Sequence, residues 1–400
     1  MRNWQPSNPR GEAAFQLGRF SRMTEKKTKG MTTRRKFLAG AAVTGAATIA
    51  MPQVSRAETV TLKMQGSWGA QDILNDFARD YVKIVNEMGE GRLTIDYLNA
   101  GAVVKPFSVM DGCHSGVLDG AHSVPAYWYG KHRAASLFGT GPAYGFNGNQ
   151  MLGWAYYGGG LELYNELIQD VLKLNVVGFL GFAMPTQPLG WFKNEVSGPD
   201  DLKGLKYRTV GLASNMFQKM GVSVAQLPGP EILPAMERGV IEAFEFNNPT
   251  SDRRFGAQDV AKLHYMGSYH QAAESFEILF NKTKFDSLAK EQQAILQHGV
   301  RAATADNEWK AWHSYSEDLQ KLIEEDNVQV KRTPTSIFEA QLKAWDEVEA
   351  DLVKDPQQGA FIKKVLDSQK AWAKRVGFYH FNNDADYRTA YEHHFGPLET

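Results

Sequence analysis

Between residues 187 and 271, four short stretches set polar side chains inside apolar, aromatic or Gly/Pro-rich surroundings. They read Gln187-Pro-Leu-Gly-Trp-Phe192, Leu202-Lys-Gly-Leu-Lys-Tyr-Arg208, Phe244-Glu245-Phe246-Asn247-Asn248-Pro249 and Ser268-Tyr-His-Gln271. Together they supply one arginine, one glutamate and two glutamines close to aromatic rings. A planar guanidinium pairs with a carboxylate through two hydrogen bonds, and amide oxygens can hold a hard cation. This set can therefore grip a small carboxylate, alone or through a bound cation, in a cleft that excludes water.

Outward from these stretches, the apolar pattern alternates between strands and helices. The first half predicts strands at 59–64, 92–98, 120–124 and 175–182, helices at 71–88, 107–118 and 161–172, and a loop-like segment at 139–160. The second half predicts strands at 190–193, 207–210, 223–226 and 242–246, the last returning across a hinge, with a further candidate at 274–281. Such alternation is typical of parallel sheets covered by helices. Met184-Pro185 interrupts the pattern and marks a crossing into a second lobe.

The C-terminal third is predicted to be helical. From Ser287 to about Glu325 the chain is amphipathic and nearly free of Pro and Gly. One continuous helix of that length would span roughly 58 Å, more than one lobe, so we expect it to run along both. A break near Gly299 into two or three helices is the alternative. Further helices are predicted at 336–353 and 357–375.

The composition excludes several classes of protein. The 400 residues suggest about two to three domains, with 43% hydrophobic and 22% charged residues. The 44 basic residues nearly balance the 45 acidic ones, which argues against a nucleic-acid partner or an anionic membrane surface. The single cysteine, Cys113, excludes an intrachain disulfide and is expected to be a small buried residue. The chain also lacks a Gly-x-Ser-x-Gly motif and a P-loop, which weakens an enzymatic reading.

Residues 1–57 are predicted to be an N-terminal extension and an export signal. Thr32-Thr33-Arg34-Arg35-Lys36-Phe37-Leu38 resembles the twin-arginine signal, and Ser55-Arg56-Ala57 fits a signal peptidase site. The apolar run between them is shorter than a membrane helix requires. We therefore expect twin-arginine export to the periplasm and a mature chain that begins near Glu58. Because such a pair normally lies close to the start, translation is expected to begin at Met23 or Met31.

Four motifs in order resemble the solute-binding subunits of tripartite ATP-independent periplasmic (TRAP) transporters, the DctP-like family. They are Gly190-Trp-Phe-Lys193, Asp201-Leu-Lys-Gly-Leu-Lys-Tyr-Arg208, Leu227-Pro-Gly-Pro-Glu231 and Gly239-Val-Ile-Glu-Ala-Phe-Glu245. The likeness runs from about Val60 to Gln369 and is greatest to the branch that binds 2-oxo acids and lactate. It implies an α/β fold: a two-lobed periplasmic-binding-protein clamshell with a long C-terminal helix spanning both lobes, and no catalysis.

The expected domain bounds follow from this resemblance and the element pattern. Lobe I is expected at 58–183, with part of 247–272 returning through the hinge, and lobe II at 184–286. Residues 287–400 are expected to form C-terminal helices that span the lobes and permit a homodimer.

The resemblance also implies the site residues. The expected substrate contacts are Arg208, Gln187, Phe246, Asn248, Tyr127 and Trp68, and the expected cation ligands are Gln187, Glu245, Phe246 and Gln271. Oxygen ligands suit Na⁺ or Ca²⁺. Each residue also has an alternative without a binding role. Arg208 could form a surface salt bridge, Glu245 could face solvent, Asn248 could belong to an Asn-Pro turn, and Trp68 and Tyr127 could be core residues. The branch usually has Trp where this chain has Phe246. Phenylalanine keeps the backbone carbonyl that would bind the cation, but it cannot make the hydrogen bond of an indole N–H.

The expected function is that of a binding protein rather than an enzyme. It would capture a 2-oxo or 2-hydroxy monocarboxylate, close its lobes around it, and deliver it to a TRAP membrane permease. A periplasmic enzyme and a ligand sensor for a membrane receptor are the alternatives.

Overall fold

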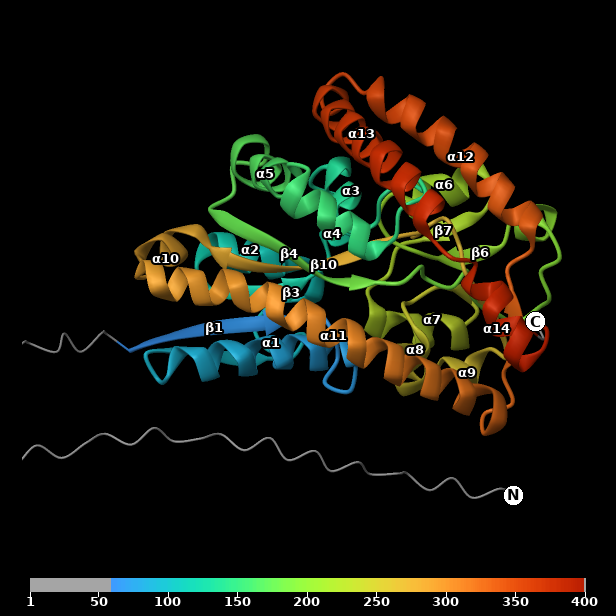
Figure 1. Ribbon diagram of the computed structural model, residues 1–400, viewed down its shortest axis with the longest axis horizontal. Coiled ribbons are helices and arrows are strands. Elements are labelled where there is room, and N and C mark those ends of the chain that lie inside the picture. The colour runs from blue at the N-terminus through green and yellow to red at the C-terminus, as the bar shows by residue number, and fades with distance from the viewer. Residues whose placement is uncertain (1–58, 399–400) are drawn as a thin grey trace, which may run out of the picture. The chain divides into compact units, whose positions relative to one another are not determined.

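The computed structural model describes residues 59–398, so the predicted export signal lies outside the described residues. The described chain forms two mixed β-sheets with helices packed around them (Figure 1). The predicted α/β class is therefore confirmed. Because each sheet collects most of its strands from one half of the chain, we call the two halves lobe I and lobe II.

The lobe I sheet contains five strands in the order β2-β1-β3-β10-β4. Their bounds are β1 Val60–Gly66, β2 Leu93–Leu98, β3 Gly120–Ser123, β4 Val176–Met184 and β10 Glu274–Asn281. Strand β1 pairs in parallel with β2 and β3, whereas β10 lies antiparallel between β3 and β4. The sheet is thus mixed and not parallel as predicted, because β10 enters it from the opposite end, out of lobe II.

The lobe II sheet contains six strands in the order β11-β9-β5-β8-β6-β7. Their bounds are β5 Gly190–Phe192, β6 Lys206–Arg208, β7 Ser223–Ala225, β8 Ala243–Phe244, β9 Leu263–Met266 and β11 Gln329–Arg332. Strand β6 pairs in parallel with β7 and β8, and β5 is antiparallel to β8 and β9.

The chain crosses between the sheets after β4, at the predicted Met184-Pro185, and returns between β9 and β10. Two expectations about these crossings are wrong. Strand β8 stays in the lobe II sheet instead of returning across the hinge, and 274–281 is an interior strand of lobe I although it was assigned to lobe II. Alternation identifies a strand, but its pairing partner is decided by side-chain fit between distant parts of the chain.

One long helix connects the two lobes. Helix α11 (Lys290–Glu324) has 35 residues and continues through Gly299, so the predicted single helix is confirmed. At 1.5 Å per residue it is about 52 Å long. It packs against α1 (Ile73–Gly89) and β4 of lobe I and, toward its C-terminal end, against α8 (Pro249–Phe255), as Figure 1 shows.

A pair of helices forms a second connection. Helices α12 (Thr335–Val353) and α13 (Gly359–Asn383) pack against each other. Helix α12 contacts α6 (Ala213–Lys219) of lobe II, while α13 contacts α4 (Gly148–Tyr157) and α5 (Gly160–Glu166) of lobe I. The lobes are therefore joined by helices as well as by the strand crossings.

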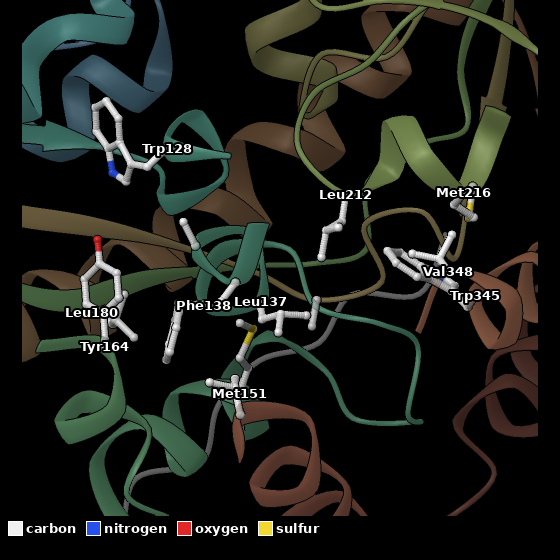
Figure 2. Close-up of a cluster of buried hydrophobic side chains, with 14 of the residues drawn as sticks. Trp128, Leu137, Phe138, Met151, Tyr164, Leu180, Leu212, Met216, Trp345 and Val348 are labelled. Carbon is white, nitrogen blue, oxygen red and sulfur yellow. The ribbon is translucent and has the colours of Figure 1, made fainter. Parts of the chain in front are cut away.

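A buried apolar cluster continues from lobe I into lobe II and onto α12 (Figure 2). Its labelled members include Phe138 and Tyr164 of lobe I, Leu212 and Met216 of lobe II, and Trp345 of α12. Burying large apolar side chains in this way is the main favourable term in folding. Cys113 is buried in the same cluster, as expected.

The remaining helices are short. They are α2 Val109–Ser115, α3 Ser136–Gly139, α7 Ile232–Glu237, α9 Ala257–Val260, α10 Lys282–Ser287 and α14 Tyr387–Phe395. Helix α4 lies in the segment predicted to be a loop. Its start is a capping box, in which Asn147 Oδ1 accepts from the Gln150 amide at 3.0 Å and Gln150 Oε1 accepts from the Asn147 amide at 2.9 Å. Within residues 59–398, no helix combines the length and the apolar character that crossing a membrane requires.

Candidate functional site

A small cavity lies between the lobes, where the crossing segments meet. Six of the eight expected site residues line it: Trp68, Tyr127, Gln187, Arg208, Phe246 and Gln271. Its volume is about 20 Å³, which is room for about one water molecule. The walls must therefore move apart before a ligand of several atoms can enter. We call this space the interlobe cavity.

Arg208 is the best-anchored polar residue of the interlobe cavity. It is the last residue of β6, and its side chain is only 2% exposed. Its Nε donates to the Leu227 carbonyl at 2.8 Å, and its Nη1 donates to the Glu245 carbonyl at 2.8 Å and to Glu245 Oε1 at 2.9 Å. Nη2 makes no hydrogen bond to any residue between 59 and 398. The guanidinium is thus held in place on one edge while one nitrogen stays available to a ligand.

Glu245 completes a buried ion pair with Arg208. The residue follows β8 directly and is fully buried, so the solvent-facing alternative is excluded. Burial raises the pKa of its carboxyl group, and the positive charge of Arg208 counteracts this effect. Thr209 lies near enough to lower the pKa of this carboxyl group, but in the described part of the chain neither its hydroxyl nor Glu245 Oε2 has a partner with hydrogen-bond geometry. A buried carboxylate oxygen without a donor is costly, so this atom is suited to a positively charged partner.

The two glutamines approach the cavity from different crossing segments. Gln187 follows β4, Gln271 precedes β10, and the Gln187 amide donates to the Gln271 carbonyl at 3.2 Å. The Gln187 side chain donates through Nε2, which leaves its Oε1 without a partner among residues 59–398. The same holds for both amide atoms of Gln271. The backbone carbonyl of Phe246 likewise accepts no hydrogen bond from the described residues.

Four oxygens of the expected cation ligands therefore lack a hydrogen-bond donor among residues 59–398, and three of them are buried side-chain atoms. They are Gln187 Oε1, Glu245 Oε2, Gln271 Oε1 and the carbonyl oxygen of Phe246. Native proteins leave few buried polar atoms unsatisfied, so several at one place require an explanation. Uncharged and carboxylate oxygens are the ligands that hard cations such as Na⁺ and Ca²⁺ prefer. The residues present fit such an ion.

Two further polar residues line the interlobe cavity, and the sequence reading missed both. Glu274 is the first residue of β10, and its Oε2 accepts from Gln187 Nε2 at 2.8 Å and from Asn247 Nδ2 at 2.9 Å. Burial raises the pKa of Glu274 to about 8, although the hydrogen bond from Gln187 works against this rise. The available signal was a glutamate at the start of a largely apolar β-strand candidate, three residues after Gln271.

The structure places Asn247, and not the expected Asn248, on the cavity wall. Asn248 is the N-cap of α8, where its Oδ1 accepts from the Ser251 amide at 2.9 Å. That hydrogen bond satisfies a free amide of the first helical turn, so the side chain is committed to the helix.

Trp68 and Tyr127 lie on the lobe I wall of the cavity, with ring centroids 6.3 Å apart. Burial raises the pKa of Tyr127 to about 12, while the charge of Arg208 lowers it.

Hydrogen bonds and ion pairs join the lobes around the cavity. Tyr129 donates to Asn215 Oδ1 at 2.8 Å. Ser251 Oγ donates to Asp72 Oδ1 at 2.6 Å, and Arg254 pairs with Asp76 at 2.7 Å. The described arrangement is therefore one in which side chains of the two lobes are in direct contact.

Comparison with known proteins gives the same picture. Residues 64–358 match the family described as bacterial extracellular solute-binding protein, family 7. The monocarboxylate 2-oxoacid-binding periplasmic protein all3028 of Nostoc sp. is 31% identical over 312 residues, which are 78% of this chain and 83% of that protein.

Two solved TRAP solute-binding proteins resemble the fold. One, from Pseudoalteromonas atlantica with bound sodium and pyruvate, has a TM-score of 0.74 and 29% identity, and the match covers 86% of this chain and all of that one. The other, from Bordetella bronchiseptica, is a mixed-occupancy dimer with calcium and picolinate bound; it has a TM-score of 0.73 and 27% identity, over 82% and 97% of the two chains.

These matches confirm the predicted two-lobed fold and the expectation of a binding protein rather than an enzyme. The chain belongs to the family 7 bacterial extracellular solute-binding proteins, the family of the TRAP transporter solute-binding subunits.

Proposed function

We propose that this protein binds a small organic acid, a 2-oxo or 2-hydroxy monocarboxylate, together with a Na⁺ or Ca²⁺ ion in the interlobe cavity. The observation that carries the proposal is the set of four oxygens that lack donors in the described part of the chain, together with the buried Arg208. Arg208 Nη2 would donate to the ligand carboxylate, because its other two nitrogens are already held by backbone carbonyls and Glu245.

The cation would be held by Gln187, Glu245, Gln271 and the carbonyl of Phe246. When bound, it would supply positive charge between two anions, the ligand and Glu245, that otherwise repel each other. Glu274 supports this set indirectly, since its hydrogen bond from Gln187 Nε2 fixes which end of that amide is free.

The nature of the ligand is inferred from the relatives. The Nostoc protein is named for monocarboxylate 2-oxo acids, and the two structural neighbours hold pyruvate and picolinate. In all of these ligands the carbon atom bonded to the carboxylate is also bonded to a second polar atom. This atom is the oxo oxygen in the 2-oxo acids and the ring nitrogen in picolinate. Lactate has the same arrangement with a hydroxyl group.

Ligand capture would couple to closure of the lobes. Arg208 and Phe246 come from lobe II, whereas Trp68 and Tyr127 come from lobe I, so only a closed arrangement lets both walls contact one small molecule. Differential contact of this kind shifts the population toward the closed form. Closure also removes water from the ion pairs, which strengthens them.

Calorimetry with the mature chain, from residue 58, tests the binding proposal. Pyruvate, lactate and picolinate are titrated with and without a chelator, and with Na⁺ replaced by K⁺. We expect binding of at least one acid that weakens strongly when the cation is withdrawn. Unchanged affinity after both treatments would contradict the proposed role of a cation. If none of the acids binds, the proposed carboxylate ligand is wrong.

We further propose delivery of the ligand to a TRAP permease after export to the periplasm by the twin-arginine route. A strain lacking this protein should lose uptake of the labelled acid and regain it with the wild-type chain. Replacing Arg34 and Arg35 by Lys should leave the precursor in the cytoplasm. Export that survives this change would exclude the twin-arginine route.

A homodimer through the C-terminal helices is the remaining proposal. The end of α13 and helix α14 present aromatic side chains that are at least 67% exposed: Phe378, Tyr379, Phe381, Tyr387 and Phe395. Exposed apolar patches of this kind mark protein interfaces. Light scattering should report a dimer that the double change Phe378→Ser and Phe381→Ser converts to a monomer, whereas Trp309→Ser on α11 should not.

A further inference from the structure

The segment that carries Gln271 to the interlobe cavity has no regular secondary structure. Residues 267–273 lie between β9 and β10, outside any helix or strand. Ser268, His270 and Gln271 are each at most 1% exposed, so water does not satisfy their backbone groups. A buried amide or carbonyl without a partner costs free energy. The hydrogen bonds of this segment must therefore come from elsewhere in the protein.

Helix α12 supplies the partners of Tyr269, which lies two residues before Gln271. Gln341 Oε1 accepts from the Tyr269 amide at 2.7 Å, and Trp345 Nε1 donates to the Tyr269 carbonyl at 2.8 Å. Gln341 Nε2 also donates to Ser268 Oγ at 2.7 Å. The two α12 residues are four positions apart, which places them on the same face of the helix. One helix face thus holds both backbone groups of a single residue in the crossing.

Helix α12 is itself firmly packed. Gln341 is fully buried and Trp345 is only 2% exposed. Trp345 belongs to the same apolar cluster as Met216 of α6, and both are labelled in Figure 2. The helix also packs against α6 and α13 along its length. Because closely packed interiors resist displacement, α12 is a fixed support for the crossing segment.

Gln271 depends on this support because little else fixes it. Its side-chain amide has no partner among residues 59–398, and its backbone carbonyl accepts from the Gln187 amide at 3.2 Å. Two residues of chain span at most about 7 Å, so Gln271 lies close to the held peptide groups of Tyr269. A shift of Tyr269 would therefore be passed directly to the Gln271 amide.

We infer that Gln341 and Trp345 are positioning residues for the cation, because they hold the crossing segment so that Gln271 Oε1 stays at the site. This inference rests on the proposed function, since it takes Gln271 to be a cation ligand. Neither α12 residue lines the interlobe cavity, so both act through the backbone of the crossing. A hard cation such as Ca²⁺ keeps its oxygen ligands at about 2.3–2.6 Å, so even a small displacement of one ligand weakens binding.

The test uses the mature chain and two variants. Gln341→Leu removes both amide hydrogen bonds, whereas Trp345→Phe removes only the indole N–H and keeps an apolar ring. Gln369→Leu on α13 is the matched control, because Gln369 is equally buried and its Nε2 donates to the Leu137 carbonyl of lobe I at 2.6 Å. The test acid is whichever of pyruvate, lactate and picolinate the wild type binds most tightly.

Calorimetry gives two quantities for each protein. The first is the Ca²⁺ or Na⁺ concentration that half-saturates the chelated protein at saturating acid, and the second is the affinity for the acid at saturating cation. Loss of a partner that orients a metal ligand typically costs about tenfold or more in metal affinity, so we expect at least a tenfold rise in the first quantity for Gln341→Leu. It should rise about threefold for Trp345→Phe, which loses one hydrogen bond, and less than about twofold for Gln369→Leu. The second quantity should stay within about threefold of the wild type in all three variants, because excess cation restores the site.

The outcomes separate the two proposals. If the wild type requires a cation and both α12 variants need no more of it than Gln369→Leu does, the positioning assignment is wrong and the proposed function stands. Weaker binding of the acid at saturating cation would also overturn the assignment, because it would show general damage to the site. If Gln341→Leu does not fold, Trp345→Phe decides the result against the same control. If the wild type binds no acid, or binds one without a cation, both proposals are wrong.

Discussion

Arg208→Met is the change that tests the site most directly. The substitution keeps an apolar stem of similar length but removes three hydrogen bonds, one to Leu227 and two to Glu245. It also leaves the carboxylate of Glu245 fully buried without its charged partner. The effect on the folded protein and the effect on ligand binding can be measured separately.

The magnitude follows from the burial of the pair. Removing one partner of a buried ion pair costs about 3–5 kcal/mol of unfolding free energy, because the remaining charge is uncompensated. Adding Glu245→Gln removes that charge, so the double variant should recover part of the loss. The coupling energy between the two sites should lie between about 1 and 3 kcal/mol. Ligand affinity should fall by at least about thirtyfold, as expected when one member of a buried charge pair is truncated.

Urea unfolding followed by tryptophan fluorescence gives the stabilities of the wild type, the two single variants and the double variant. Calorimetry with pyruvate gives the affinities. Arg388→Met is a matched control, since Arg388 forms an exposed pair with Glu392 on α14 and should change stability by less than about 0.5 kcal/mol. If Arg208→Met lowers the unfolding free energy by less than about 1 kcal/mol and leaves pyruvate affinity unchanged, Arg208 is neither a buried structural ion-pair partner nor a ligand contact.

Three further changes test neighbouring features. Gln271→Met replaces two amide atoms that lack partners among residues 59–398, so unfolding free energy should stay level or rise by about 1 kcal/mol while the cation-dependent part of pyruvate affinity disappears in calorimetry. Gly211→Val introduces a side chain where φ is +63° and a Cβ would lie 2.7 Å from Ser136 Oγ of lobe I. Because this contact would hold the lobes apart, the variant should bind ligand more weakly. Its radius of gyration in X-ray scattering should stay large at saturating ligand. Burial raises the pKa of Asp252 to about 7, so the folded state keeps this proton while the unfolded state releases it near its ordinary value of 3.8. Stability should therefore fall as pH rises from about 4 to about 7, by roughly 4 kcal/mol at most, and Asp252→Asn should flatten this slope in urea titrations.

The parts of the fold that could be predicted are those in which local pattern decides the structure. The 35-residue α11 follows from a long amphipathic run without Pro, and β1, β2 and β4 follow from apolar runs between turn residues. Helix α4 was missed because its segment is rich in Gly, although the Asn147–Gln150 capping box was a readable start signal.

The sequence allowed most residues of the site to be predicted, but it did not allow the contacts between them to be predicted. Arg208, Gln187 and Gln271 stand out in the sequence as polar residues in apolar surroundings, but their expected roles came from the resemblance to the TRAP family. The ion pair between Arg208 and Glu245 could not be predicted, since it joins residues 37 positions apart through strand pairing. Glu274 was missed because it belongs to a strand whose sheet was misassigned. Its two amide partners come from distant segments, Gln187 from the crossing after β4 and Asn247 from the turn between β8 and α8.

The place of β10 within the lobe I sheet has a consequence for how the chain folds during synthesis. A nascent chain that ends before residue 274 lacks the strand that joins β3 to β4, and both would then present unpaired backbone edges. Open strand edges of this kind recruit other chains and favour aggregation. Lobe I can be completed only after most of lobe II has emerged from the ribosome, so premature termination or proteolytic clipping between the lobes should yield insoluble fragments instead of an independently folded half.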